Sequence, residues 1–164
     1  MEVLRMLFTE AVVLCAALFM LCFLGTGTDA KNLQNYSSYP AAAQSRIRAI
    51  PEYEHQFKEQ NPFLTFTANF LLFLAILFVF GIFIRQSDFT HNFLSLLFLG
   101  QTLNAFDLII IDLLWWRHTP RIRFSKLPQP ALYQDPRKHI SAFIRAFIMF
   151  CVIALIDGYL LTLF

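Results

Sequence analysis

The sequence predicts an all-α, polytopic membrane protein with four transmembrane helices in an antiparallel bundle. Hydrophobic residues make up 57% of its 164 residues and charged residues only 15%. This is too little polar surface to cover a water-soluble globule of this size. Four apolar stretches reach the roughly 20 residues that cross a roughly 30 Å hydrocarbon layer. Because helices satisfy their own backbone in lipid, and no alternating strand pattern suggests a barrel, helices are the expected spanning structure.

The four predicted transmembrane helices cover about residues 3–24, 62–84, 92–116 and 138–163. The first could be mistaken for a secretory signal, but Glu2 and Glu10 interrupt its basic start and its apolar core, so a spanning helix is predicted. Asn61 and Asp135 each precede a proline, an arrangement typical of a helix start, so the second and fourth helices are predicted to begin there. The glycines at positions 25 and 27 are expected to end the first helix.

The two larger loops, residues 26–60 and 117–137, are predicted to lie on the same side of the membrane. Helix formers after two prolines predict one or two short helices in loop 1, within Ala41–Ile50 and Glu52–Gln60, lying on the membrane surface or over the bundle. Most Lys and Arg residues lie in these loops, so the positive-inside rule predicts that both are cytoplasmic and both termini outside. We expect residues 1–164 to form one integral domain in the cell membrane.

Polar side chains inside the predicted spans are costly in hydrocarbon and often mark ion or proton pathways. When the depth of each polar side chain is counted from its helix end at about 1.5 Å per residue, these side chains fall at two levels within the membrane. Asn104 and Asp107 lie between the two levels. A carboxylate-lined path is the resulting hypothesis. Its candidate residues are Glu10, Asn69, Gln101, Asn104, Asp107, Asp112, Arg145 and Asp157.

The strongest predicted pair is Asp112 with Arg145, which neighbouring antiparallel helices would place at matching depth. Such an ion pair could fix helix register or could break on substrate binding or proton transfer, and the sequence favours neither. Glu10, Asp107 and Asp157 have no evident cation. They are expected to be protonated or to bind a proton or a cation, unless Glu10 and Asp157 lie close enough to the interface to be wetted.

The start of loop 3 interleaves basic and aromatic residues at the predicted interface, where Trp115 and Trp116 end the third helix. Such a patch attracts anionic lipid headgroups or phosphate, or merely orients the protein. The candidate contacts are Arg117, Arg121, Arg123 and Lys126.

The sequence predicts no metal site and no cofactor, and it identifies no particular catalytic residue. It contains no HExxH, CxxC or phosphate-binding glycine motif. Cys15, Cys22 and Cys151 lie in apolar runs and are interpreted as small hydrophobic side chains, and histidines at the loops, His118 and His139 among them, as solvated. Nucleic acid is not an expected partner at a net charge of +2.

Three functions are compatible with this pattern. The leading hypothesis is a permease-like or transport-associated protein, an accessory subunit included. Four helices without a repeated half are few for a complete transporter, so a homo-oligomer or a partner membrane subunit is expected. The second is an interfacial enzyme or binding protein for an anionic lipid or amphiphile, in which arginines hold the anion and a histidine or Asp112 moves protons. The third is a non-catalytic partner or scaffold subunit.

Overall fold

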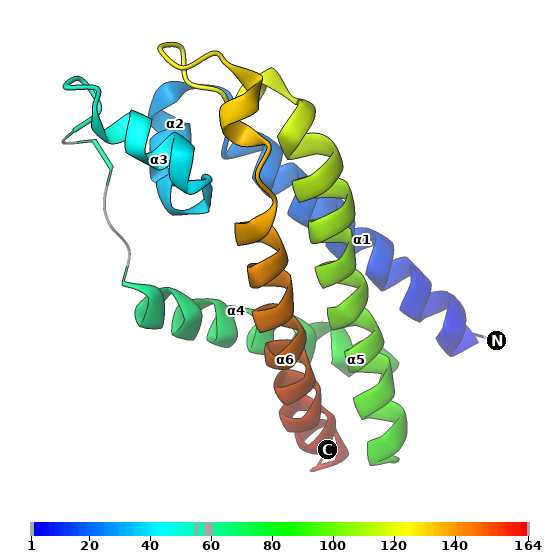
Figure 1. Ribbon diagram of the computed structural model, residues 1–164. Coiled ribbons are helices and arrows are strands. Elements are labelled where there is room, and N and C mark those ends of the chain that lie inside the picture. The colour runs from blue at the N-terminus through cyan, green and yellow to red at the C-terminus, as the bar shows by residue number, and fades with distance from the viewer. Residues whose placement is uncertain (1, 55, 58–60, 164) are drawn as a thin grey trace. The chain divides into compact units, whose positions relative to one another are not determined.

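The computed structural model describes residues 2–54, 56–57 and 61–163, and the regular secondary structure of this part of the chain is helical, with no strand (Figure 1). The only β feature within it is an isolated bridge between Phe124 and Leu127. Four helices are long and apolar enough to cross a membrane, which confirms the predicted all-α class and the four long segments. They are α1 (Glu2–Leu24), α4 (Pro62–Ile84), α5 (Phe89–Phe106) with its continuation, and α6 (Arg137–Leu160).

The ends of these helices follow the predicted signals. Asn61 Oδ1 accepts hydrogen bonds from the backbone N–H groups of Phe63 (3.0 Å) and Leu64 (3.4 Å), which caps α4. Asp135 Oδ1 accepts one from Arg137 N (3.0 Å) at the start of α6. After α1, Gly27 has φ +107°, a backbone conformation that favours glycine.

The third long helix changes geometry along its length. Residues Asp107–Trp116 continue α5 as a π-helix, in which hydrogen bonds run from residue i to i+5 and each turn is wider than in an α-helix. The predicted depths of the polar side chains on this helix assume α-helical spacing, which does not apply beyond Phe106. Asp107 and Asp112 are instead separated by one i to i+5 step.

Loop 1 contains α2 (Asp29–Gln34) and α3 (Ala41–Arg48). The short helix predicted within Ala41–Ile50 is confirmed by α3. The second predicted helix, Glu52–Gln60, is wrong in its described part, because Pro51–Glu54 form turns; residues 55 and 58–60 lie outside the described residues. Helix α2 was not predicted. It begins where Thr28 Oγ1 accepts a hydrogen bond from Lys31 N.

The chain divides into two compact units. Unit 1 comprises Met1–Ala17, Asn61–Phe106 and Phe143–Phe164, and unit 2 comprises Leu18–Gln60 and Asp107–Ala142. Within unit 1, α5 and α6 pack closely at two glycines: a Cβ at Gly100 would meet Phe150, and one at Gly158 would meet Phe93. Since the contacts advance along α5 as they recede along α6, these two helices run antiparallel.

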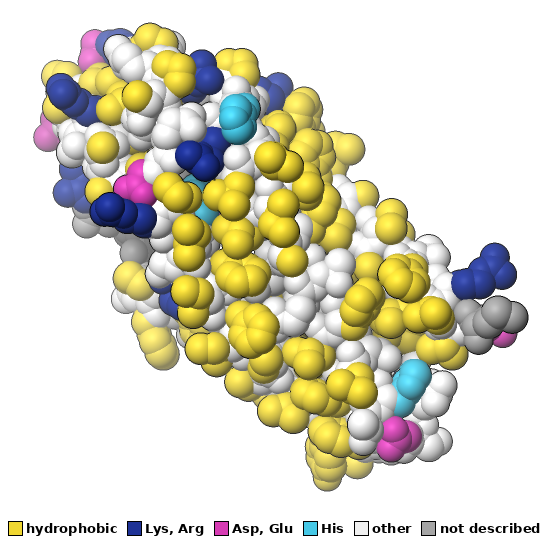
Figure 2. All heavy atoms as spheres, turned by 45° about the vertical axis from the view of Figure 1, so that its right-hand side comes forward, with side chains coloured by type: hydrophobic (Ala, Val, Ile, Leu, Met, Phe, Trp, Pro, Cys, Tyr) yellow, Lys and Arg dark blue, Asp and Glu magenta, His cyan; other side chains and the backbone are white. Residues whose placement is uncertain are grey.

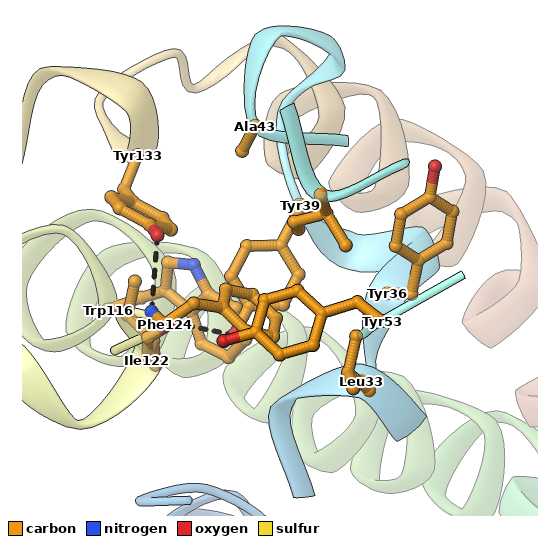
Figure 3. Packing of buried hydrophobic residues seen from close by; sticks show 10 residues of the cluster. Leu33, Tyr36, Tyr39, Ala43, Tyr53, Trp116, Ile122, Phe124 and Tyr133 are labelled. Atoms are coloured by element: carbon orange, nitrogen blue, oxygen red, sulfur yellow. Dashed lines mark hydrogen bonds between the residues drawn. The ribbon is translucent and has the colours of Figure 1, made fainter. Parts of the chain in front are cut away.

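Unit 2 has a core built largely from aromatic side chains (Figure 3). Tyr39 is fully buried and donates a hydrogen bond from its hydroxyl to the carbonyl of Ile122 (2.7 Å). Tyr133 accepts one from Phe124 N (3.2 Å) and donates one to the carbonyl of Leu127 (2.7 Å). The hydroxyls therefore satisfy loop 3 backbone groups while the rings bury apolar area.

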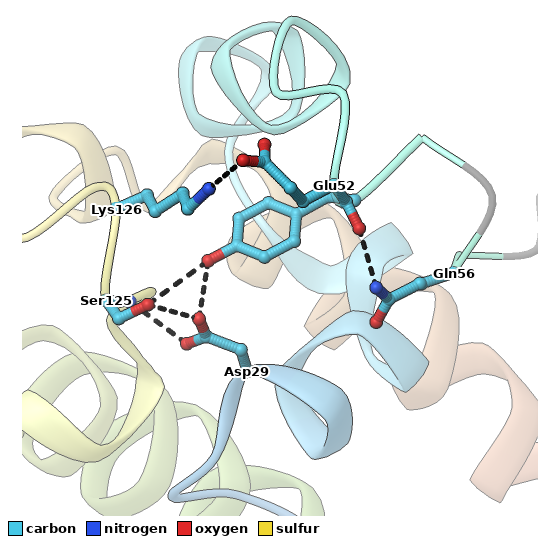
Figure 4. Close-up of polar contacts among 6 residues, drawn as sticks. Asp29, Glu52, Gln56, Ser125 and Lys126 are labelled. Carbon is cyan, nitrogen blue, oxygen red and sulfur yellow. Dashed lines mark hydrogen bonds and ion pairs between the residues drawn. The ribbon is translucent and has the colours of Figure 1, made fainter.

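Loop 1 and loop 3 are also joined by polar contacts in unit 2 (Figure 4). Asp29 accepts hydrogen bonds from Ser125 Oγ (2.5 Å), Ser125 N (3.0 Å) and Tyr53 OH (2.5 Å), and Lys126 pairs with Glu52. Burial alone would raise the pKa of Asp29, but the hydrogen bonds from Ser125 and Tyr53 outweigh it and hold this pKa below its ordinary value.

The long helices expose large apolar side chains. Phe63 and Leu72 on α4 are 78% and 54% exposed, and Val12 on α1 is 67% exposed. On the face drawn in Figure 2, hydrophobic side chains cover much of the long helices. Apolar surface of this extent is typical of helices that face lipid or another protein.

Candidate functional site

The most organised polar pair in unit 2 joins Asp112 of the π-helical segment to His139 of α6. His139 Nδ1 lies 2.8 Å from Asp112 Oδ1, and the side chains are 8% and 14% exposed, respectively. A carboxylate that accepts a hydrogen bond from Nδ1 fixes the orientation of the imidazole and leaves Nε2 as the reactive nitrogen. This Nε2 is buried and has no hydrogen-bond partner among the described residues.

Trp116 lies beside this pair. Its ring meets that of His139 edge-on, with 6.0 Å between centroids. The indole is buried, and its Nε1 likewise has no hydrogen-bond partner in the part of the chain that the structure describes. Two buried ring nitrogens on neighbouring side chains are thus left unsatisfied, which is uncommon in a folded protein.

Asp107 begins the π-helical segment that also carries Asp112. The segment therefore contributes two carboxylates to unit 2.

Two further carboxylates lie in unit 1. Asp157 on α6 is 0% exposed, and neither of its carboxylate oxygens has a hydrogen-bond partner among the described residues. Glu10 on α1 is 9% exposed, and its Oε2 is equally unsatisfied. A buried carboxylate without a partner is stable only when it carries a proton or when a cation binds it.

Two of the three amides of the predicted path have a structural role. Gln101 Nε2 donates to the carbonyl of Phe147 (3.0 Å), and Asn104 Nδ2 donates to that of Phe143 (3.2 Å). Both side chains lie on α5 and both acceptors on α6. The amides therefore connect the antiparallel pair through hydrogen bonds between the helices.

Two predicted path residues remain. Asn69 on α4 is exposed. Arg145 lies on α6 in unit 1 and Asp112 in unit 2, and their predicted pairing stays a prediction. Within unit 2, Asp112 forms an ion pair with His139.

The basic residues of loop 3 are engaged within unit 2. The Arg121 guanidinium donates to the carbonyls of Phe23 and Thr26 (3.1 Å each) and lies 3.9 Å above the centre of the Phe23 ring. Arg117 donates to Gln134, Arg123 donates to the carbonyl of His118, and Lys126 pairs with Glu52. An anionic headgroup would have to share these side chains, so lipid binding there stays a prediction.

His139 is the site residue that sequence reasoning missed, because it was interpreted as a solvated loop histidine. The signal that could have identified it is its position after the cap at Asp135, which places it within the first turn of α6. Among the described residues, no group of three or more His, Cys, Asp and Glu side chains could hold a metal ion. No protein-family model, curated protein or solved structure matches this chain.

Proposed function

We propose that this chain is an integral membrane protein with a transport-associated function, in which buried carboxylates carry protons or cations between helices. Asp157 carries the proposal, because it is 0% exposed and both of its carboxylate oxygens lack a partner in the described part of the chain. Ionised carboxylates in hydrocarbon are rare and mark ion or proton pathways. Glu10 in the same unit supports the same function.

The membrane setting is part of the proposal. Four helices of sufficient length and exposed apolar side chains on α1 and α4 support it. In this setting the four helices cross the cell membrane as an antiparallel bundle, of which α5 and α6 form one antiparallel pair, with loops 1 and 3 in the cytoplasm. Four helices are few for a complete pathway, so a second copy or another membrane subunit would complete it.

Proton flux into proteoliposomes tests the transport proposal. With a pH-sensitive dye inside and a potassium diffusion potential across the bilayer, the wild-type protein should carry protons faster than protein-free vesicles. Asp157→Asn should reduce this rate at least about tenfold, since the amide cannot exchange a proton. Asp88→Asn is the matched control, because Asp88 is exposed in the short link before α5.

Wild-type flux equal to that of protein-free vesicles would refute the proposal. So would flux in the Asp157→Asn protein that matches wild type while the variant keeps its helicity and its elution volume.

Single cysteines test the orientation. In a background with the three native cysteines replaced by alanine, Ser45→Cys in α3 and Ser87→Cys between α4 and α5 place thiols at exposed positions. A membrane-impermeant maleimide added to intact cells should label position 87 alone, and should label position 45 only after permeabilisation. The reverse pattern would invert the proposed topology.

The Asp112–His139 pair favours a second candidate function, an interfacial enzyme that acts on an anionic lipid. With Nδ1 held at 2.8 Å from Asp112, His139 Nε2 could accept a proton from water or from a lipid hydroxyl. Incubation with phosphatidylglycerol vesicles, followed by phosphorus NMR, should then reveal headgroup release that His139→Gln abolishes and His118→Gln leaves unchanged. An unaltered spectrum with wild-type protein would remove this candidate.

A further inference from the structure

A largely open, groove-like cavity of about 520 Å³ lies in unit 1 between the first turns of α1 and the last turns of α4. Its apolar walls include Met6 from α1 and Phe80 and Phe83 from α4. Its polar lining comes from α1, and three of these polar residues, Glu2, Arg5 and Thr9, are exposed. The cavity therefore combines an aromatic wall with charged groups near the ends of two apolar helices.

Glu10 lines this cavity from a buried position. It is only 9% exposed, and its Oε2 has no hydrogen-bond partner among the described residues. An unsatisfied carboxylate oxygen on a cavity wall can gain an ion pair or a charge-assisted hydrogen bond from a ligand. The neighbouring hydroxyl does not satisfy it, because Thr9 Oγ1 donates to the carbonyl of Arg5 (2.8 Å).

The charged and aromatic side chains that line the cavity indicate which class of ligand would bind there. Its two carboxylates and one guanidinium favour a ligand of net positive charge. The faces of Phe80 and Phe83 attract cations and apolar groups alike. A hydrated inorganic ion would leave the apolar walls unused, whereas a cation with aromatic or alkyl substituents would cover them.

We propose that this cavity binds a lipophilic organic cation, with its positive centre at Glu10 and its apolar substituents against Phe80 and Phe83. This inference rests on the proposed membrane setting and names the class of cation that the transport function would take. Because Glu2 and Arg5 lie at the start of α1, near the end of the apolar segment, an amphiphilic cation dissolved in the interface would reach the cavity from the bilayer surface. Arg5 then opposes binding through its like charge.

Binding of tetraphenylphosphonium to the full-length protein in lipid nanodiscs tests the proposal. Equilibrium dialysis, corrected with empty nanodiscs, should show saturable binding of this cation and none of tetraphenylborate, an anion of the same shape. Glu10→Gln should weaken binding at least about tenfold, since it removes the anionic partner. Phe80→Leu should weaken it by about two- to fivefold, because a cation–π contact is lost.

Arg5→Gln distinguishes a cation site from an anion site. Because Arg5 is exposed, this substitution should leave the fold intact, and circular dichroism checks that it does. Binding of the cation should become tighter, by about two- to fivefold. Asp88→Asn, at an exposed position in the short link before α5, should leave the affinity unchanged. Weaker binding in Arg5→Gln, or wild-type affinity in Glu10→Gln, would overturn the assignment.

The binding experiment and the flux experiment test the two proposals independently. Glu10-dependent binding without proton flux in proteoliposomes would refute the proposed proton transport and keep the cation site. Flux that depends on Asp157, combined with cation binding that ignores Glu10, would refute the cation site alone.

Discussion

Unit 2 and unit 1 satisfy their polar groups in different ways. In unit 2, buried tyrosine hydroxyls bond to backbone carbonyls and Asp29 accepts three hydrogen bonds from loop 3 and Tyr53. In unit 1, Glu10 and Asp157 are buried with oxygens that lack partners among the described residues, while large apolar side chains such as that of Phe63 are exposed. Unit 2 also leaves buried polar atoms without partners among the described residues, but they belong to Asn32, Trp116, Arg121 and His139, whereas those of unit 1 all belong to carboxylates.

This difference between the units indicates which residues should be tested for a function. Unsatisfied buried polar groups are few in folded proteins and need an explanation. In unit 2 the explanation concerns the neighbourhood of His139 and Trp116, and in unit 1 it concerns the two carboxylates. The aromatic core and the Asp29 contacts of unit 2, by contrast, are explained by stability alone.

Truncating a core side chain in unit 2 should have the largest effect. Phe124 is 1% exposed and packs against Tyr39 and Tyr53, so Phe124→Ala should lower the free energy of unfolding by about 3–5 kcal/mol. Phe63→Ala, at a site that is 78% exposed, should change it by less than about 0.5 kcal/mol. Denaturant titration in detergent measures both. Equal losses at the two sites would abolish the contrast between the units.

Asp29→Asn should have a smaller and pH-dependent effect. Hydrogen bonds to a carboxylate are stronger than those to an amide, but Asp29 is partly exposed, so a loss of about 1 kcal/mol is expected at neutral pH. Because its pKa is lowered in the folded state, this stabilisation is present above the ordinary aspartate pKa of about 4 and is lost as the pH falls through the folded value. Unfolding titrations should therefore converge for wild type and variant in acid. A constant difference down to low pH would contradict this role.

The smallest effect is expected within the helix pair of unit 1. Gln101→Leu removes the hydrogen bond to the Phe147 carbonyl and should destabilise the protein by about 0.6 kcal/mol, the average for such contacts in membranes. Asn69→Leu replaces an exposed amide on α4 and should cause no loss. Thermal unfolding in one detergent compares the two variants. A larger loss at Asn69 would show that its side chain makes a contact essential to the fold.

Much of the helical framework could be predicted from sequence because long apolar segments and their caps are local signals. The segment predicted at 62–84 matches α4 at both ends, since Asn61 caps it and its apolar run ends at Ile84. Helix α2 could not be predicted in the same way. Its six residues carry no apolar period, and Asp29 is held by Ser125, 96 positions away.

The candidate site was predicted only in part. Asp107, Asp112 and Asp157 stand out in sequence because charges are rare in apolar segments. The contact of Asp112 with His139 did not, because it depends on how the start of α6 packs against the π-helical turns before Trp116. The predicted pairing of Asp112 with Arg145 stays a prediction. The cavity at Glu10 depends on how α4 packs against α1, which hydropathy does not encode.

The central claim is that lipid surrounds the long helices and that water surrounds the helices of the loops. Spin labels at Leu72 on α4, which is 54% exposed, and at the exposed Ser45 on α3 test this directly in reconstituted bilayers. Power saturation should show the label at position 72 relaxed mainly by oxygen and the label at position 45 mainly by a water-soluble nickel chelate. A label at position 72 that the nickel chelate relaxes as strongly as the label at position 45 would contradict the membrane setting.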